Sequence, residues 1–213
     1  MKLRQKIQKN DGVAMIVCIT IISILVIFCF SLLLASYTFY ASQNKNTQSD
    51  LNAEAAKTLS MALREELTES SEKSNLVKYL RYNVQQDSWP YYEPSTSGHE
   101  AEYAKRYFNL NVNGDTVLDG YPGMVSVSMY WMLPEPEEEE ETPDADDINR
   151  TRLFIEVECK SGSQSYVVVS EYQLSVFNEN STYIAQSTKK SFNPANKTIN
   201  TNEVWKWGFV GIQ

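Results

Sequence analysis

Residues 13–35 read VAMIVCITIISILVIFCFSLLLA, and this stretch decides how the chain of 213 residues is organised. No charged residue occurs between Asp11 and Lys45. Because about 20 consecutive apolar residues in a helix cross a bilayer core, the stretch predicts a transmembrane helix over residues 13–40. A cleavable secretory signal is the alternative, but its apolar region is usually only about 7–15 residues long. The pattern therefore favours a permanent anchor.

The residues on either side of this segment predict its orientation. Four basic residues precede it: Lys2, Arg4, Lys6 and Lys9. Since basic flanks stay on the cytoplasmic side, residues 1–12 are predicted to form a cytoplasmic leader. Tyr37, Phe39 and Tyr40 lie at the other end, where aromatic side chains favour the membrane interface. We therefore expect a single-pass protein of the cell membrane with an extracytoplasmic C-terminal domain and membrane lipid as a partner.

The exterior begins with a helical region, residues 41–98. Within it, residues 51–69 read LNAEAAKTLSMALREELTE, and apolar residues recur there every three or four positions. Such spacing predicts an amphipathic helix with one apolar face. Neither Gly nor Pro occurs in residues 13–89, so the anchor and the amphipathic segment can form one continuous helix. A further helix is predicted over residues 76–86.

The remaining region, residues 99–213, shows the alternation of a half-buried β-sheet. Apolar and polar residues alternate in residues 125–133, 153–159 and 166–177, and short turns follow these stretches. No helical crossover is predicted between them. The expected fold class is therefore α+β, with the long helix packed on an antiparallel β-meander that has one buried and one polar face.

Three smaller features belong to this predicted sheet. An Asn-Gly pair at residues 113–114 predicts a hairpin turn. A turn at residues 178–180 leads into a short predicted strand over residues 182–186. Trp205 and Trp207 lie on one side of a predicted last strand, and the pattern allows them to belong either to the core or to an interface.

Acidic residues are concentrated in one segment. The net charge is −8, and nine acidic residues lie within residues 135–147. Prolines within and beside this run oppose helix and sheet, so a disordered, solvated loop is predicted over residues 134–149. A calcium site is the alternative, but such sites usually require Gly and alternating oxygen ligands, which are lacking here. The negative charge also argues against nucleic acid as a partner.

Residues that carry catalytic chemistry are scarce. His99 is the single histidine, and Cys159 is the single cysteine outside the predicted anchor. The sequence shows no Ser-His-Asp signature, no zinc-binding spacing and no phosphate-binding glycine loop. We therefore expect no enzyme activity, no catalytic residue, no metal and no cofactor.

Glycosylation sequons occur at Asn149, Asn180 and Asn196. In a bacterial chain they arise by chance in an exterior rich in Asn, Ser and Thr. In a eukaryotic chain they would mark a luminal or extracellular domain. We favour the first interpretation, and the second stays open at this point.

The order of the segments resembles that of type IV pilins and pseudopilins. A basic tail ends at Gly12, an uncharged helix begins at Val13, and an amphipathic continuation and a sheet follow. The run GVAMIVCITIISILVIF is similar to the start of PilX-like minor pilins, and residues 52–56 (NAEAA) are similar to their Ala-Glu-Ala region. The resemblance implies that a prepilin peptidase cleaves between Gly12 and Val13. It also implies other pilin-like subunits and an assembly platform as partners.

One position departs from the family pattern. Major pilins carry a glutamate at the fifth position of the mature helix, and this chain has Val17 there. In the family that carboxylate pairs with the N-terminal amine of a neighbour, because a charge in lipid needs a partner. Its absence implies a minor subunit that starts or caps a type IV pilus or secretion pseudopilus at the cell surface.

Within the anchor, Ala14, Thr20 and Ser23 are candidate helix-packing residues, or residues that lipid simply tolerates. The expected function is structural. A membrane-anchored extracytoplasmic binding or sensor domain that does not enter a fibre is the alternative.

Overall fold

The computed structural model describes residues 2–68, 74–85, 88–93, 104–109, 118, 120–133, 148–184, 192–193, 198–199 and 203–213. Within the first helix, side chains are described from Met15 onward. The chain forms two compact units, Met1–Thr47 and Gln48–Gln213.

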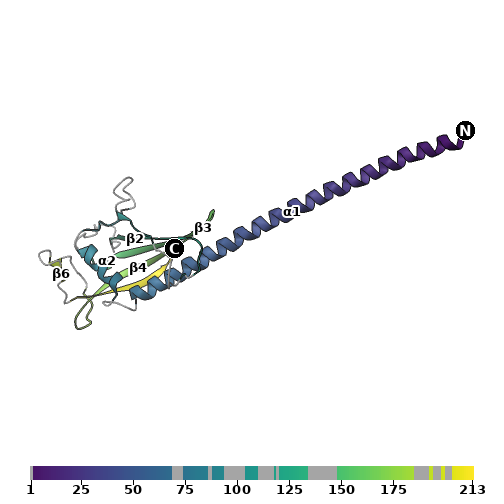
Figure 1. The fold of residues 1–213 in the computed structure, drawn as a ribbon. Coiled ribbons are helices and arrows are strands. Elements are labelled where there is room, and N and C mark those ends of the chain that lie inside the picture. The colour runs from purple at the N-terminus through teal and green to yellow at the C-terminus, as the bar shows by residue number, and fades with distance from the viewer. Residues whose placement is uncertain are drawn as a thin grey trace, which may run out of the picture. The chain divides into compact units, whose positions relative to one another are not determined.

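A single helix, α1 (Lys2–Thr68), contains both the predicted anchor and the predicted amphipathic segment (Figure 1). It has 67 residues, far more than the roughly 11–12 of an average helix. Its continuity confirms the prediction of one helix through both segments. The physical reason is that no proline interrupts the backbone hydrogen bonds and that Leu, Ala, Lys and Glu favour the helix beyond the candidate membrane span.

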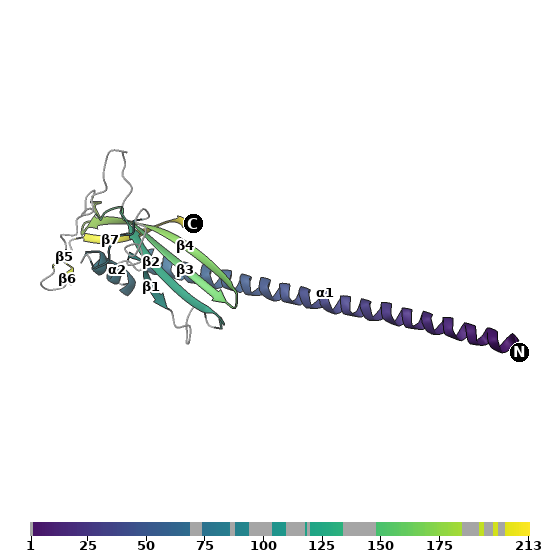
Figure 2. The ribbon, with the colours of Figure 1, turned by 90° about the horizontal axis from the view of Figure 1, so that it is seen from above.

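A five-stranded antiparallel sheet forms the centre of the second unit (Figure 2). In spatial order its strands are β1 (Arg106–Asn109), β2 (Met124–Met132), β3 (Arg152–Ser161), β4 (Gln164–Asn178) and β7 (Glu203–Ile212). Strands β1 to β4 are neighbours both in sequence and in space, which confirms the antiparallel meander and the α+β class. The strand beside β4 on the other side is β7. Between them in sequence, β5 (Phe192–Asn193) and β6 (Thr198–Ile199) pair with each other in a separate two-stranded sheet.

Two of the smaller predictions fall partly or wholly outside the described residues. The hairpin predicted at residues 113–114 lies outside them. Of the strand predicted over residues 182–186, the described part shows a single antiparallel bridge, between Tyr183 and Phe177. Ser181 stands in the tight turn before it with a positive φ of 62°.

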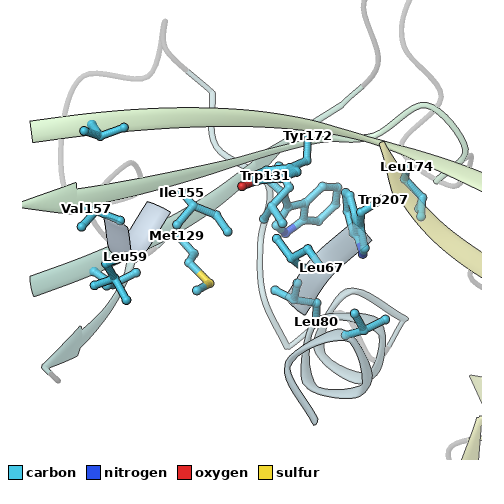
Figure 3. Close-up of a cluster of buried hydrophobic side chains, with 14 of the residues drawn as sticks. Leu59, Leu67, Leu80, Met129, Trp131, Ile155, Val157, Tyr172, Leu174 and Trp207 are labelled. Atoms are coloured by element: carbon cyan, nitrogen blue, oxygen red, sulfur yellow. The ribbon is translucent and has the colours of Figure 1, made fainter. Parts of the chain in front are cut away.

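One face of the sheet packs against α1 and against α2 (Asn75–Gln85) to form the core (Figure 3). The register pairs Trp131 with Leu153 and Leu153 with Tyr172, so residues from three strands point to the same side. Trp205 and Trp207 are 0% and 3% exposed. Both tryptophans therefore belong to the core, which settles the question that the sequence pattern left open.

The alternation predicted a polar opposite face of the sheet. The structure corrects this prediction, because the opposite face is not uniformly polar. Phe154 lies on it and is only 3% exposed. Its ring stacks on Tyr130, with 5.0 Å between ring centroids and 9° between ring planes. The guanidinium carbon of Arg152 lies 5.3 Å from the same ring centroid. Cross-strand stacking and a cation–π contact thus shield an apolar side chain on the outer face.

Helix α2 confirms the helix predicted over residues 76–86, with described bounds at Asn75 and Gln85. The Ser74 hydroxyl accepts hydrogen bonds from the backbone N–H groups of Leu76 at 3.1 Å and Val77 at 3.3 Å. A serine in this place satisfies N–H groups that have no partner inside the helix. The local sequence therefore determines where α2 begins.

Candidate functional site

The first part of α1 exposes a long apolar surface. Among the described residues, it is the one helix long and apolar enough to cross a membrane. Its most apolar window has a mean hydropathy of 3.1, and none of that window is buried. The large apolar side chains from Met15 to Tyr40 are 48–72% exposed. Apolar surface of this extent is stable against lipid or another protein rather than against water.

The hydroxyl groups within this surface are satisfied by the helix itself. Thr20 donates to the carbonyl oxygen of Ile16 at 2.8 Å, and Ser23 donates to that of Ile19 at 2.8 Å. Such bonds to the preceding turn remove the cost of an unpaired donor in hydrocarbon. Thr20 and Ser23, two of the predicted packing residues, therefore need no hydrogen-bond partner outside the helix. Their side chains are small, so another helix can still pack against α1 at these positions.

The positions implied by the pilin resemblance all lie within α1. Gly12, Val13 and Ala14 have helical backbone. Val17 is 50% exposed on the helix surface. A glutamate at this position would project outward from α1, so the Val17 side chain presents an apolar surface where the major-pilin carboxylate would stand.

The candidate membrane span also carries two exposed, free cysteines, Cys18 and Cys29. They are separated by three helical turns, or roughly 16 Å, which excludes a disulfide within one helix. An apolar groove with a volume of about 360 Å³ runs beside Cys29. Its other lining residues are Ile22, Leu25, Val26, Phe30 and Leu33.

Cys159 differs from these two because it is completely buried. Burial, assisted by the negative charge of Glu158, raises the pKa of its thiol to about 11. The thiolate is the reactive form of cysteine, so Cys159 is inert near neutral pH. It acts as a small apolar side chain in the core.

In the second unit, α1 changes from an exposed helix to a core element. Its apolar face is buried against the sheet through four side chains: Ala55, Ala56, Leu59 and Leu67. Among these, Ala56 and Leu67 are 0% and 1% exposed. The predicted amphipathic face is therefore confirmed, and the same helix that carries the candidate membrane span also supplies one layer of the folded domain.

Polar contacts fix the position of α1 on the domain at two points. Asn52 is fully buried, and its side-chain amide donates to the carbonyl oxygen of Gln164 at 2.9 Å. The Tyr121 hydroxyl donates to the Asn52 side-chain oxygen at 2.6 Å. Two turns further on, the hydroxyls of Ser60 and Ser170 lie 2.7 Å apart. These bonds join the helix to the start and to the middle of β4.

Another side of α1 remains exposed in the second unit and carries charges of both signs along one stripe. Glu54 lies there beside a groove with a volume of about 440 Å³, between α1 and the turn around Tyr121. Lys57, Met61 and Arg64 follow Glu54 at helical spacing on the same stripe, and Met61 is 67% exposed. The sequence pattern indicated a charged face on this helix. The groove could not be predicted from that pattern, because the turn that forms its other wall lies more than 60 residues away in sequence.

The outer face of the sheet carries an ordered polar network that the sequence pattern did not reveal. Lys105 forms an ion pair with Glu156 at 2.9 Å, and the Ser128 hydroxyl donates to the same carboxylate at 2.8 Å. Arg152 pairs with Glu171 at 2.7 Å. Burial, followed by the charge of Glu156, raises the pKa of Tyr130 to about 12. The described charges of this network neutralise one another, and their role is to order the sheet surface.

The remaining predicted features have different outcomes. His99 and residues 134–147 of the acidic loop lie outside the described residues. The last two residues of that predicted loop, Ile148 and Asn149, are buried. Among the described residues, no group of three or more His, Cys, Asp or Glu side chains is arranged to hold a metal ion.

The sequons also differ in accessibility. The Asn149 side-chain amide is 1% exposed and donates to the Tyr183 hydroxyl and to the carbonyl oxygen of Ile184, both at 2.8 Å. This geometry leaves Asn149 inaccessible to glycosylation in the folded chain. Asn180 lies exposed in a turn, and Asn196 lies outside the described residues.

The chain matches no family model, no curated protein and no solved structure. Any functional assignment therefore depends on the chain's own residues and geometry, above all on α1.

Proposed function

We propose that this chain is a single-pass, membrane-anchored structural subunit of the pilin type. In this proposal it is a minor subunit of a type IV pilus or a secretion pseudopilus at the cell surface. The observation that supports it most is α1, which joins an exposed apolar segment and the core of the folded domain in one helix without a break.

The membrane part of the proposal rests on surface chemistry. The segment from Met15 to Tyr40 exposes large apolar side chains, and its hydroxyl groups are bonded internally. Both properties suit a helix in hydrocarbon. The basic residues before it favour a cytoplasmic N-terminus by the positive-inside bias, which leaves the second unit outside the cell membrane.

The assembly part rests on what α1 does after the apolar segment. A plain anchor needs only to hold a domain near the membrane, and a flexible linker can do this. Here the anchor helix itself is built into the domain through Asn52, Ala56 and Leu67. A subunit that leaves the bilayer to enter a fibre must carry its apolar helix with it. Because α1 continues from the apolar segment into the core of the domain, the helix and the domain would move together. The presence of Val17 in place of a glutamate favours a minor subunit.

The proposal is tested by intact-mass measurement of the full chain extracted from membranes that contain a prepilin peptidase. We expect a mature chain that starts at Val13. The variant Gly12→Leu should retain residues 1–12, whereas the control Val13→Phe, which gives the residue more usual after the cleavage site, should still be cleaved. A wild-type chain that keeps its first twelve residues beside an active peptidase would favour an anchored binding or sensor domain instead.

A further inference from the structure

Helix α1 enters the second unit at one end of the five-stranded sheet. The Gln48 side chain lies beside Gly162, in the turn between β3 and β4. One helical turn further on, Asn52 donates to the carbonyl oxygen of Gln164, the first residue of β4. The end of β3 and the start of β4 therefore lie at the point where α1 continues toward the candidate membrane span.

This end of the sheet exposes apolar side chains on its outer face. Met124, the first residue of β2, is 73% exposed, more than any other large apolar side chain in the described part of the chain. The register places it opposite Lys160, near the end of β3. Val167, near the start of β4, is 50% exposed on the same face. We call Met124, Lys160, Val167 and the exposed Pro122 the end patch.

With the candidate membrane span in a bilayer, the covalent chain limits how far the end patch can lie from lipid. Gln48 is the eighth residue after Tyr40, which belongs to the aromatic residues expected at the membrane interface. In a continuous helix this separation is roughly 12 Å. The headgroup layer accounts for about 5–7 Å of it. Membrane helices tilt by roughly 20° on average and by up to about 40°, and a tilt toward the sheet lowers the end patch to the headgroups.

The surface of α1 that is turned away from the sheet favours this direction of tilt. It carries the exposed charged side chains Asp50, Glu54, Lys57 and Arg64. Apolar side chains gain free energy when they leave water for the membrane interface, whereas exposed charges lose hydration there. A tilt toward the sheet brings the end patch to lipid and keeps the charged stripe in water.

We propose that the end patch binds the surface of the bilayer that holds the anchor. Met124 would enter the boundary between headgroups and acyl chains, and the Lys160 ammonium group would meet lipid phosphate groups. Covalent continuity identifies the partner, because α1 itself brings lipid to this end of the sheet. The inference rests on the membrane half of the proposed function, and it goes further by giving the folded domain a lipid contact of its own.

Fluorescence quenching by lipid tests this contact. The full chain carries a maleimide-linked bimane at Met124→Cys in a background with Cys18→Ser and Cys29→Ser, and buried Cys159 is retained. It is reconstituted in phosphatidylcholine vesicles with and without a nitroxide on the lipid headgroup. The nitroxide should lower the emission by about twofold or more, because an interfacial side chain lies within roughly 5–10 Å of the headgroups. Bimane at the control site Glu179→Cys, exposed in the turn after β4, should lose little emission.

A charge substitution gives the second part of the test. The bimane is placed at Ser163→Cys, an exposed site in the turn between β3 and β4, so that Met124 itself can be varied. Met124→Asp should remove most of the quenching at Ser163→Cys, because a carboxylate at this position opposes entry into the interface. Tyr107→Asp, at a 65% exposed position of the same outer face, is the matched control and should leave the quenching unchanged.

Two results would overturn the contact. One is equal quenching at the Met124→Cys and Glu179→Cys sites. The other is quenching at Ser163→Cys that survives Met124→Asp.

Failure of this contact is distinguishable from failure of the proposed function. A chain that resists extraction from the vesicles by alkaline carbonate, but is not quenched at Met124→Cys, keeps its anchor and loses this contact. A chain that carbonate extracts loses the membrane half of the proposed function and the contact with it. Cleavage after Gly12 decides the pilin assignment and is measured separately.

Discussion

The Tyr121 hydroxyl donates a 2.6 Å hydrogen bond to the side-chain oxygen of Asn52, a fully buried asparagine on α1. The same asparagine donates to the carbonyl oxygen of Gln164, in the first residue of β4. One polar side chain on a helix therefore joins two turns of the domain that are more than 40 residues apart in sequence. Burial also raises the pKa of the Tyr121 hydroxyl, which keeps this donor protonated.

Replacing Asn52 with alanine should destabilise the second unit. The substitution leaves the Tyr121 hydroxyl and the Gln164 carbonyl group without their buried partner, at a cost of about 2 kcal/mol in the free energy of unfolding. The measurement is thermal unfolding of the full chain in detergent, where a fall in Tm of roughly 4–8 °C is expected. Asn46→Ala, at an exposed position of α1, is the control and should leave Tm unchanged. Equal Tm values for both variants would contradict this role of Asn52.

Two glycines with positive φ form a matched pair for a second prediction. Gly162 has a φ of 60°, and an added Cβ would lie 3.2 Å from the Gln48 side-chain oxygen. Gly120 has a φ of 83°, and no atom lies within 4 Å of its added Cβ. Alanine at either position should cost about 1 kcal/mol in unfolding free energy through backbone strain alone. Gly162→Ala should cost more because of the added contact, and Gln48→Ala should remove that excess; urea unfolding measures both. No excess at Gly162 would mean that the Gln48 side chain moves aside freely.

Much of this fold follows from patterns in the sequence. The uncharged segment from Val13 and the absence of proline before Pro90 predict one long helix. This prediction is possible because helix formation depends on the residue types and their spacing within the segment itself. The alternation that ends at Leu133 predicts β2 for the same reason, since burial of every second residue is a property of the strand itself. The buried faces of α1 and of the meander therefore follow from the period of each segment alone.

Other features depend on which distant residues meet, and local pattern does not determine that. Phe154 lies on the face predicted to be polar and is buried there because the register brings Tyr130 of β2 beside it, while Arg152 covers it from two residues earlier on the same strand. The groove beside Glu54 requires the turn at Tyr121 to lie near α1. Strand β7 lies beside β4, although β5 and β6 come between them in sequence and pair with each other in a separate sheet. The alternation of residues within β4 and β7 does not predict this pairing.

The tryptophans of the core differ in whether their indole N–H groups are bonded. The Trp131 indole donates to the carbonyl oxygen of Trp89 at 2.9 Å, whereas the Trp207 indole N–H has no acceptor among the described residues. Trp131→Phe should therefore destabilise the domain by about 1 kcal/mol more than Trp207→Phe, because only the first leaves a carbonyl group without its donor. Chemical unfolding followed by the fluorescence of the remaining tryptophans measures the difference. Equal losses, or a larger loss for Trp207→Phe, would show that ring packing alone decides the stability at these sites.

The buried thiol of Cys159 predicts how stability depends on alkaline pH. Its pKa is raised from 9.0 to about 11 in the folded chain, so the folded state holds the thiol proton more tightly than the unfolded state does. Its contribution to stability is complete below pH 9 and is lost as the pH rises from about 9 to 11, by an amount on the order of 1–2 kcal/mol. Cys159→Ala should reduce the slope of unfolding free energy against pH in this window and leave the slope between pH 6 and 8 unchanged. In a Cys18→Ser, Cys29→Ser background, a maleimide at pH 7.5 should label Cys159 only as fast as the domain unfolds. Rapid labelling of the folded chain, or an unchanged alkaline slope in the alanine variant, would show that water reaches this part of the core.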